Sequence, residues 1–158
     1  MFEQSIFYYK LNRYLPNFTW YGTKGCKKKY LKSPQWLRNI KNKKFLFWRL
    51  DTLLSDTKYM NKYYINSGGW HFSNLKNAED IEIKLKSYLH HRDYEVEELG
   101  LKKINELIKN NQTVYDMFGD KISKKYGDDK RKKLEKYEFS NLPEYIKLNK
   151  DKLKEWID

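Results

Sequence analysis

The sequence predicts an α/β fold in a single domain over residues 1–158, with a strand-rich part over residues 1–75 and a helical part over residues 76–158. In the first part, short runs of aromatic and β-branched residues are separated by Pro and Gly, which is typical of strands. In the second part, apolar residues recur every three or four positions, which is typical of amphipathic helices. We therefore expect the strands first and the helices after them. The predicted strands are few for a complete sheet.

Two strands are predicted at the start of the chain, over Ser5–Tyr14 and Phe18–Thr23, with a turn at Pro16-Asn17 between them. No strand precedes the first one in this sequence. It must therefore pair with a later strand or with one that has been lost.

A short helix and a further strand are predicted next. Ser33 is a suitable N-cap and Pro34 a suitable first helical residue, and we expect this helix to end between Asn39 and Lys44. The apolar run Phe45–Leu50 predicts a buried strand, although its periodicity does not exclude a helix.

The segment Tyr63–Asn74 is the centre of the prediction. Strand-forming residues lead into Gly68 and Gly69, and a glycine pair in such a run marks a bulge, a turn or a close approach of backbone to a ligand. If the following residues are extended, Trp70 and Phe72 share one face and His71 takes the other. Two interpretations of His71 stay open here: a ligand-binding side chain, or a hydrogen-bonded histidine of the core.

Three helices are predicted in the second part. The first begins after Asn77, which can cap it, and reaches about His90; the second covers Glu97–Asn110, and the third begins at Leu142-Pro143-Glu144. The apolar stripes expected to face inward are Ala78, Ile81, Leu85, Tyr88 and Leu89; Leu101, Ile104, Leu107 and Ile108; and Leu142, Tyr145, Leu153 and Trp156.

Composition narrows the range of functions. The 33 Lys or Arg against 21 Asp or Glu give a formal net charge of +12, which indicates an anionic partner such as a nucleic acid, a phosphate-bearing ligand or an acidic membrane surface. A single cysteine, Cys26, excludes an internal disulfide, and three histidines without a familiar spacing exclude a zinc cluster. The chain has no run of 18 apolar residues and no signal-peptide pattern, so we expect a cytoplasmic protein, with peripheral attachment to a membrane left open.

Four segments, in order, resemble the C-terminal half of glycosyltransferase family 17, the β-1,4-mannosyl-glycoprotein N-acetylglucosaminyltransferases and their microbial relatives. These segments are Phe7–Asn12, Trp20–Thr23, Leu37-Arg38 and Gly68–Ser73. The Gly-Gly-Trp-His-Phe-Ser hexapeptide is the most specific of them. The helix that follows is similar too, through Glu79, Ile81, Lys84, Ser87 and His90.

The resemblance implies a Rossmann-like (GT-A-like) nucleotide-diphosphosugar transferase fold. It also implies transfer of N-acetylglucosamine from UDP-GlcNAc to a glycan acceptor with inversion. Family members carry an acidic metal motif in an N-terminal half, and this sequence has no such motif ahead of Tyr8. We therefore expect a divalent metal (Mn²⁺ or Mg²⁺) to be shared with residues of a partner chain that supplies the N-terminal half.

Site roles follow from the same resemblance. His71 is the expected metal ligand, and Gly68, Gly69, Trp70, Trp20 and Arg38 are the expected substrate-binding residues. An inverting transfer needs a general base, usually a carboxylate, and Glu79 and Asp80 are the candidates. Their alternative role is to stabilise the start of a helix.

A different class of function is compatible with the charge: a basic, non-catalytic module that binds nucleic acid or a partner chain. The sequence has no recognisable nucleic-acid motif, and its positive residues are scattered rather than concentrated on one helix. Nucleic acid is therefore the less expected partner.

Overall fold

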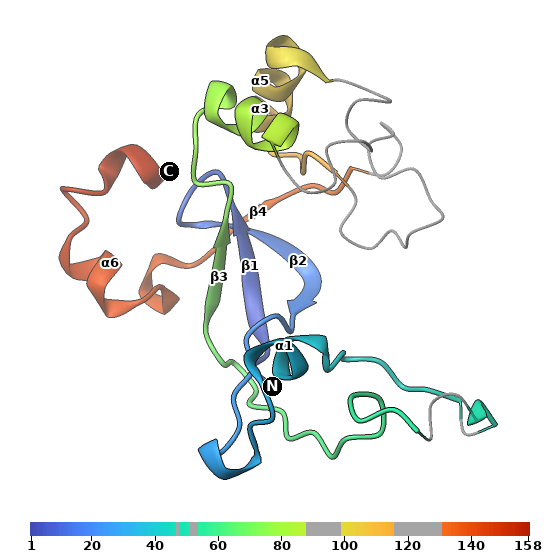
Figure 1. Ribbon diagram of the computed structural model, residues 1–158. Coiled ribbons are helices and arrows are strands. Elements are labelled where there is room, and N and C mark those ends of the chain that lie inside the picture. Colours follow the sequence, from blue (N-terminus) through green and yellow to red (C-terminus); the bar gives the residue numbers. More distant parts are fainter. Residues whose placement is uncertain (47, 51–53, 88–98, 116–130) are drawn as a thin grey trace. The chain divides into compact units, whose positions relative to one another are not determined.

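The computed structural model describes residues 1–46, 48–50, 54–87, 99–115 and 131–158 (Figure 1). Its described part has a mixed α/β fold with a four-stranded sheet in the order β3-β1-β2-β4. The chain divides into two compact units. Unit 1 comprises Met1–Ser5 and Thr19–Gly69, and unit 2 comprises Ile6–Phe18 and Trp70–Asp158. Their boundaries differ from the predicted division at residue 75, and each unit is described by itself below.

The opening strand, β1 (Gln4–Tyr8), lies between β3 (Trp70–Ser73) and β2 (Arg13–Trp20) in the sheet (Figure 1). The expectation that it pairs with later strands is therefore confirmed. The fourth strand, β4 (Glu135–Lys136), follows the helical part of the chain, so the predicted order of strands first and helices after is wrong. A pairing of two exposed residues leaves no pattern in the sequence from which it could be predicted.

The predicted strand Ser5–Tyr14 is also wrong, because the chain turns after Tyr8. Tyr9 has a left-handed backbone with φ 62°, and the backbone N–H of Arg13 donates to the Lys10 carbonyl at 3.4 Å. The turn predicted at Pro16-Asn17 lies inside β2 instead. Its pairing with β4 involves only Arg13 and Tyr14, so the missing N–H of Pro16 costs no hydrogen bond on that side.

The core of unit 2 forms around the buried side chain of Phe7. Its ring centroid lies 5.1 Å from that of Phe72 and 5.0 Å from that of Tyr137. Four buried residues, Phe7, Leu11, Leu142 and Ile146, form one hydrophobic cluster of this core. The last residues of the chain close over the β1–β2 turn: the Leu11 N–H donates to the Trp156 carbonyl at 2.7 Å, and the Asn12 amide exchanges two hydrogen bonds with the Asp158 backbone.

The helices of unit 2 largely follow the predicted periodicity. They are α3 (Ala78–Ser87), α5 (Gly100–Lys109) and α6 (Glu144–Leu148), with 3₁₀ turns η3 (Phe139–Asn141) and η4 (Lys154–Trp156). The predicted inward residues Ala78, Ile81, Leu85, Ile104, Leu107 and Leu142 are buried. Leu101 and Tyr145 are exposed, so those two predictions are wrong; Ile146, one residue further along α6, is buried instead. The predicted positions Tyr88, Leu89 and His90 lie outside the described residues.

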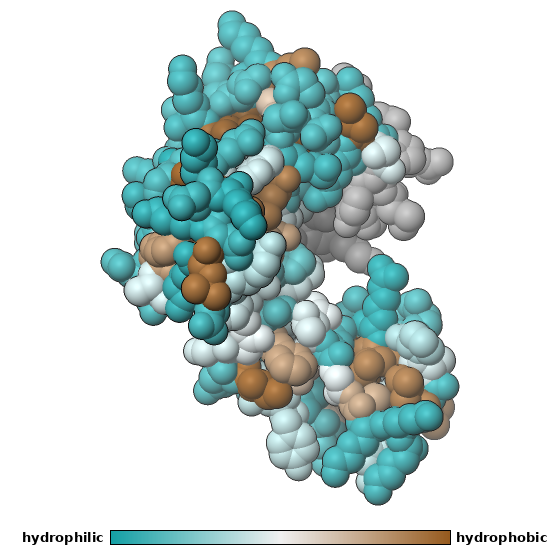
Figure 2. All heavy atoms as spheres, turned by 90° about the vertical axis from the view of Figure 1, so that its left-hand side faces the viewer, coloured by the Kyte–Doolittle hydropathy of each residue, from teal (hydrophilic) through white to brown (hydrophobic). Residues whose placement is uncertain are grey.

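Unit 1 contains α1 (Pro34–Asn39) and the 3₁₀ turn η1 (Lys28–Tyr30). Phe2 forms a parallel β-bridge with Ile65, which aligns the two ends of the unit's chain. The prediction of a buried strand at Phe45–Leu50 is wrong for its described residues: they form no strand, and Leu46, Trp48 and Leu50 are exposed. In the lower part of Figure 2, hydrophobic and hydrophilic residues lie side by side on the surface. Within the described ranges, every helix falls short of the length and apolar character that a membrane crossing requires.

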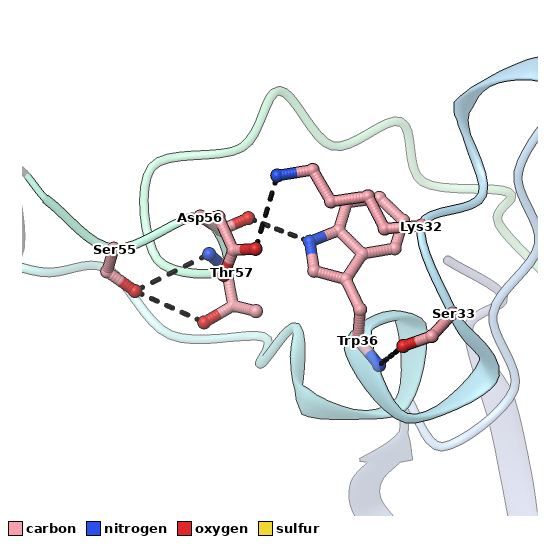
Figure 3. Close-up of polar contacts among 6 residues, drawn as sticks. All are labelled: Lys32, Ser33, Trp36, Ser55, Asp56 and Thr57. Atoms are coloured by element: carbon pink, nitrogen blue, oxygen red, sulfur yellow. Dashed lines mark hydrogen bonds and ion pairs between the residues drawn. The ribbon is translucent and has the colours of Figure 1, made fainter.

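The start of α1 gives a first testable prediction. The Ser33 hydroxyl accepts a hydrogen bond from the Trp36 backbone N–H at 3.0 Å, which confirms Ser33 as the N-cap (Figure 3). Ser33→Ala should lower the free energy of unfolding by about 1 kcal/mol, because a helix N–H loses its acceptor. Urea denaturation measures this. Ser33→Asp keeps an acceptor and should restore most of the loss; equal destabilisation by both variants would contradict a capping role.

Candidate functional site

The glycine pair has a structural reason in unit 1. A Cβ at Gly68 would lie 2.8 Å from the Ile65 carbonyl oxygen and 2.9 Å from Phe2 Cβ, and Gly69 has φ +123°. The Gly68 N–H also donates to the Glu3 carbonyl at 2.7 Å. The pair therefore lets this segment lie directly against the start of the chain. Close approach to a ligand, as the resemblance implies, stays a prediction.

Within unit 2, the alternate side chains Trp70 and Phe72 of strand β3 lie toward the same part of the fold, as expected. Phe72 packs on Phe7 in the core, and the Trp70 indole Nε1 donates to the Asn141 carbonyl at 3.2 Å. Asn141 precedes the buried Leu142, so Trp70 and Phe72 both turn toward the 139–142 segment. His71, the intervening residue, is half-buried and is influenced electrostatically by Lys84 of α3.

Lys84 is the second charged group of this site. Its ammonium donates to the Asn74 side-chain oxygen at 2.6 Å, and Asn74 is buried with φ 52°. Burial and then the neighbouring Lys76 lower the pKa of Lys84. Among the described side chains, no carboxylate forms an ion pair with Lys84. A half-buried cation with only a neutral acceptor is a favourable position for an anionic ligand.

The electrostatics of His71 give a second prediction. Burial, and then the charge on Lys84, lower the pKa of His71 below its usual value near 6.5. The unfolded chain therefore binds a proton more readily, so this contribution to stability is complete above about pH 6.5 and is lost as the pH falls through the lowered pKa. The free energy of unfolding should decrease on acidification with a slope of at most about 1.4 kcal/mol per pH unit from this group.

Urea denaturation of the wild type and of His71→Gln between pH 7.5 and pH 5 measures this contribution. The free energy of unfolding of the wild type, relative to that of His71→Gln, should decrease as the pH falls, because glutamine does not bind the proton. A constant difference over the whole range would contradict a lowered pKa in the folded chain.

The metal role of His71 stays a prediction. Among the described residues, no three or more His, Cys, Asp or Glu side chains come together as a metal-binding group. The cationic neighbour of His71, Lys84, disfavours a second cation at the imidazole. The described residues therefore do not fit a divalent ion by themselves.

The candidate bases Glu79 and Asp80 lie exposed in the first turn of α3. The Asp80 backbone N–H donates to the Asn77 side-chain oxygen at 2.8 Å, so Asn77 caps the helix as predicted. Acidic residues in a first turn stabilise a helix through its dipole, which gives both carboxylates a structural role. Their catalytic role is a prediction.

The other two candidate residues, Trp20 and Arg38, belong to unit 1. The Trp20 indole lies against Gly22, where a Cβ would be 2.3 Å from Nε1. Arg38 is exposed in the last turn of α1, and its carbonyl accepts a hydrogen bond from Lys24 Nζ at 2.8 Å. The candidate residues are thus divided between the units: Trp20, Arg38, Gly68 and Gly69 lie in unit 1, and Trp70, His71, Glu79 and Asp80 lie in unit 2.

A cavity of about 670 Å³ lies within unit 1. Its apolar wall includes Trp36, Leu37 and Ile40, which come from α1 and its C-cap. Four lysines also line it: Lys24, Lys27, Lys32 and Lys62. The wall contains no acidic residue among those that the structure describes.

The predicted site residues include neither Lys84 nor the lysines of the cavity. Lys84 follows the buried Ile81 by three positions and precedes the buried Leu85. Its position at the edge of the apolar face of the helix therefore indicates partial burial. For Lys24 and Lys27 of the cavity, the nearby Trp20 and Tyr21 in the sequence made phosphate contact possible, but charged loop residues are usually solvated.

No protein-family model matches this chain, and no curated protein or solved structure matches it.

Proposed function

We propose that this chain is the C-terminal, acceptor-side part of a glycosyltransferase similar to family 17. It transfers N-acetylglucosamine from UDP-GlcNAc to a hydroxyl of a glycan acceptor, with inversion at the anomeric carbon. The proposal rests on the resemblance of Gly68–Ser73 and on the mixed α/β fold, with which a Rossmann-like transferase fold is compatible.

The observation that carries the proposal is the half-buried ammonium of Lys84 beside His71. A sugar nucleotide has a diphosphate with two negative charges, and Lys84 has no carboxylate partner among the described residues. The diphosphate supplies the missing counter-charge, and the leaving UDP gains negative charge as the bond between the anomeric carbon and its phosphate oxygen breaks. A fixed cation at that position stabilises the developing charge.

His71 and the carboxylates have separate roles in this proposal. The lowered pKa of His71 keeps its imidazole neutral at pH 7, so one ring nitrogen can donate and the other can accept a hydrogen bond. Glu79 or Asp80 takes the proton from the acceptor hydroxyl as that oxygen attacks the anomeric carbon. Trp70 provides an apolar surface for a sugar ring.

The test is a competition experiment. UDP-GlcNAc and UDP should compete for one site on the 158-residue chain. A 20-base-pair DNA duplex, added at the same concentration of phosphate charge, should displace neither of them. Calorimetric titration measures each affinity. Displacement of UDP by the duplex, with a steep dependence of duplex affinity on salt, would contradict the proposal.

One observation favours a second candidate function, a basic module for an anionic polymer. Unit 1 has twelve Lys or Arg against three Asp or Glu, so it carries a net charge of +9 of the chain's +12. Trp48, Tyr30 and Tyr63 are exposed on this unit, and exposed aromatics stack on unpaired bases. Binding of single-stranded RNA with an affinity that decreases steeply with salt would support this function instead.

A further inference from the structure

The cavity of unit 1 has the two features of a site for an amphipathic anion: a fixed aromatic surface and a group of positive charges. Trp36 is 8% exposed as a residue, and its indole is held in the wall because Nε1 donates to the Asp56 carbonyl at 3.0 Å (Figure 3). Its backbone is held at the same time by the Ser33 cap. The cavity therefore has one aromatic surface whose position does not depend on a ligand.

The lysines of the cavity are not equivalent. Lys32 is paired with Asp56, with 3.2 Å between Nζ and Oδ2, so its charge is neutralised (Figure 3). Lys24 donates to the Arg38 carbonyl at 2.8 Å, and Lys62 donates to the carbonyls of Lys41 and Lys43 at 3.0 and 3.3 Å. These carbonyls hold the ammonium groups in place without cancelling their charge. Each ammonium has three N–H groups, which leaves donors for a ligand.

The charge of the cavity is therefore uncompensated. In the described part of the chain, none of Lys24, Lys27 and Lys62 forms an ion pair with a carboxylate. Burial lowers the pKa of Lys24 most, and the neighbouring charges of Lys41 and Arg38 lower it further. An anion would relieve this repulsion, and the apolar wall would remain in contact with the rest of the ligand.

We propose that this cavity binds a phosphate monoester carried on a planar, apolar body. The phosphate lies among Lys24, Lys27 and Lys62, and the planar body packs on the Trp36 side of the cavity. This site is separate from the His71–Lys84 site of unit 2, and it requires neither UDP nor the transfer reaction. Its failure would therefore leave the proposed glycosyltransferase function untouched.

The probe is 1-naphthyl phosphate, and its two halves, 1-naphthol and inorganic phosphate, are the controls. Cys26 reports the location of binding, because it lines the cavity, is exposed and is the single cysteine of the chain. Saturating 1-naphthyl phosphate should slow the alkylation of Cys26 by iodoacetamide at least threefold. Neither half-ligand at the same concentration should do so, since each engages only one of the two features.

A matched pair of variants tests the charge. Lys27 lines the cavity, and its neighbour Lys28 does not. Lys27→Gln should weaken 1-naphthyl phosphate binding about three- to tenfold, the effect of one partly solvated charge, while Lys28→Gln should change it less than twofold. Three results would overturn the proposal: no protection of Cys26, protection by 1-naphthol equal to that by its phosphate, or equal effects of the two variants.

Discussion

Phe7→Ala should lower the free energy of unfolding by about 3–5 kcal/mol, the usual cost of removing a fully buried phenyl ring. Phe7 is completely buried, and it contacts an aromatic ring from each of three other segments of unit 2: Phe72, Tyr14 and Tyr137. The variant would lose the transfer free energy of the ring and leave a cavity that these rings fill only in part. Urea denaturation followed by far-ultraviolet circular dichroism measures the loss.

Tyr145→Ala is the matched control for this effect. Tyr145 is an aromatic residue of the same unit, but its side chain is 70% exposed. Its replacement should change the free energy of unfolding by about 0.5 kcal/mol or less. A loss at Phe7 no larger than the change at Tyr145 would show that the core of unit 2 is not where the structure places it.

Gly68→Ala should destabilise unit 1 by about 1–3 kcal/mol, the usual cost of overpacking. The added Cβ would lie 2.8 Å from the Ile65 carbonyl oxygen, which is backbone and cannot rotate away. The segment must then move from the start of the chain, which strains the hydrogen bonds from Gly68 to Glu3 and from Ile65 to Met1. Amide hydrogen exchange at Ile65 and Gly68 should accelerate accordingly, by about tenfold or more.

Gly25→Ala provides the comparison for that substitution. The nearest atom to a Cβ at Gly25 is Phe2 Cε2 at 4.0 Å, and its φ is not in the left-handed region. This variant should be neutral or slightly stabilising, because alanine reduces the freedom of the unfolded chain. Equal exchange rates at Ile65 in both variants would contradict the close packing of Gly68.

The helices were the most predictable part of the fold, because their signals are local. Ser33 and Asn77 cap the helices that they were expected to cap. The buried residues Ile81, Leu85, Ile104 and Leu107 follow from a spacing of three and four positions. A cap or an apolar stripe needs information from only one or two turns of chain.

The strands were predicted less well, because their limits depend on partners that are distant in sequence. The turn after Tyr8 is stabilised by the end of the chain, through hydrogen bonds between Asn12 and the Asp158 backbone. Aromatic composition alone made Ser5–Tyr14 look continuous. The prediction of a strand at Phe45–Leu50 was wrong for a related reason. The residues are apolar enough for a strand, but the described ones have no strand beside them.

The candidate site was predictable in its position along the chain and less so in its chemistry. The glycine pair and the alternation of Trp70, His71 and Phe72 are visible in the sequence. The cation beside His71 is not, because Lys84 approaches it from a helix that begins several residues later. That neighbour shifts the expected ligand of the site from a metal ion toward an anionic group.

One calorimetric titration shows whether the ammonium of Lys84 binds the diphosphate of a sugar nucleotide. UDP-GlcNAc is titrated into the wild type, Lys84→Gln and Lys86→Gln. Lys84 donates to the Asn74 oxygen, and glutamine retains a neutral N–H donor on a slightly shorter side chain while the charge is lost. Lys86 lies on the same helix, but its ammonium is 3.2 Å from a carboxylate oxygen of Glu82, which neutralises it.

We expect Lys84→Gln to raise the dissociation constant for UDP-GlcNAc about tenfold or more, the effect of losing one charge-assisted hydrogen bond, and Lys86→Gln to change it less than twofold. The same dissociation constant for all three proteins, or no binding of UDP-GlcNAc by the wild type, would contradict a role of Lys84 in binding the diphosphate.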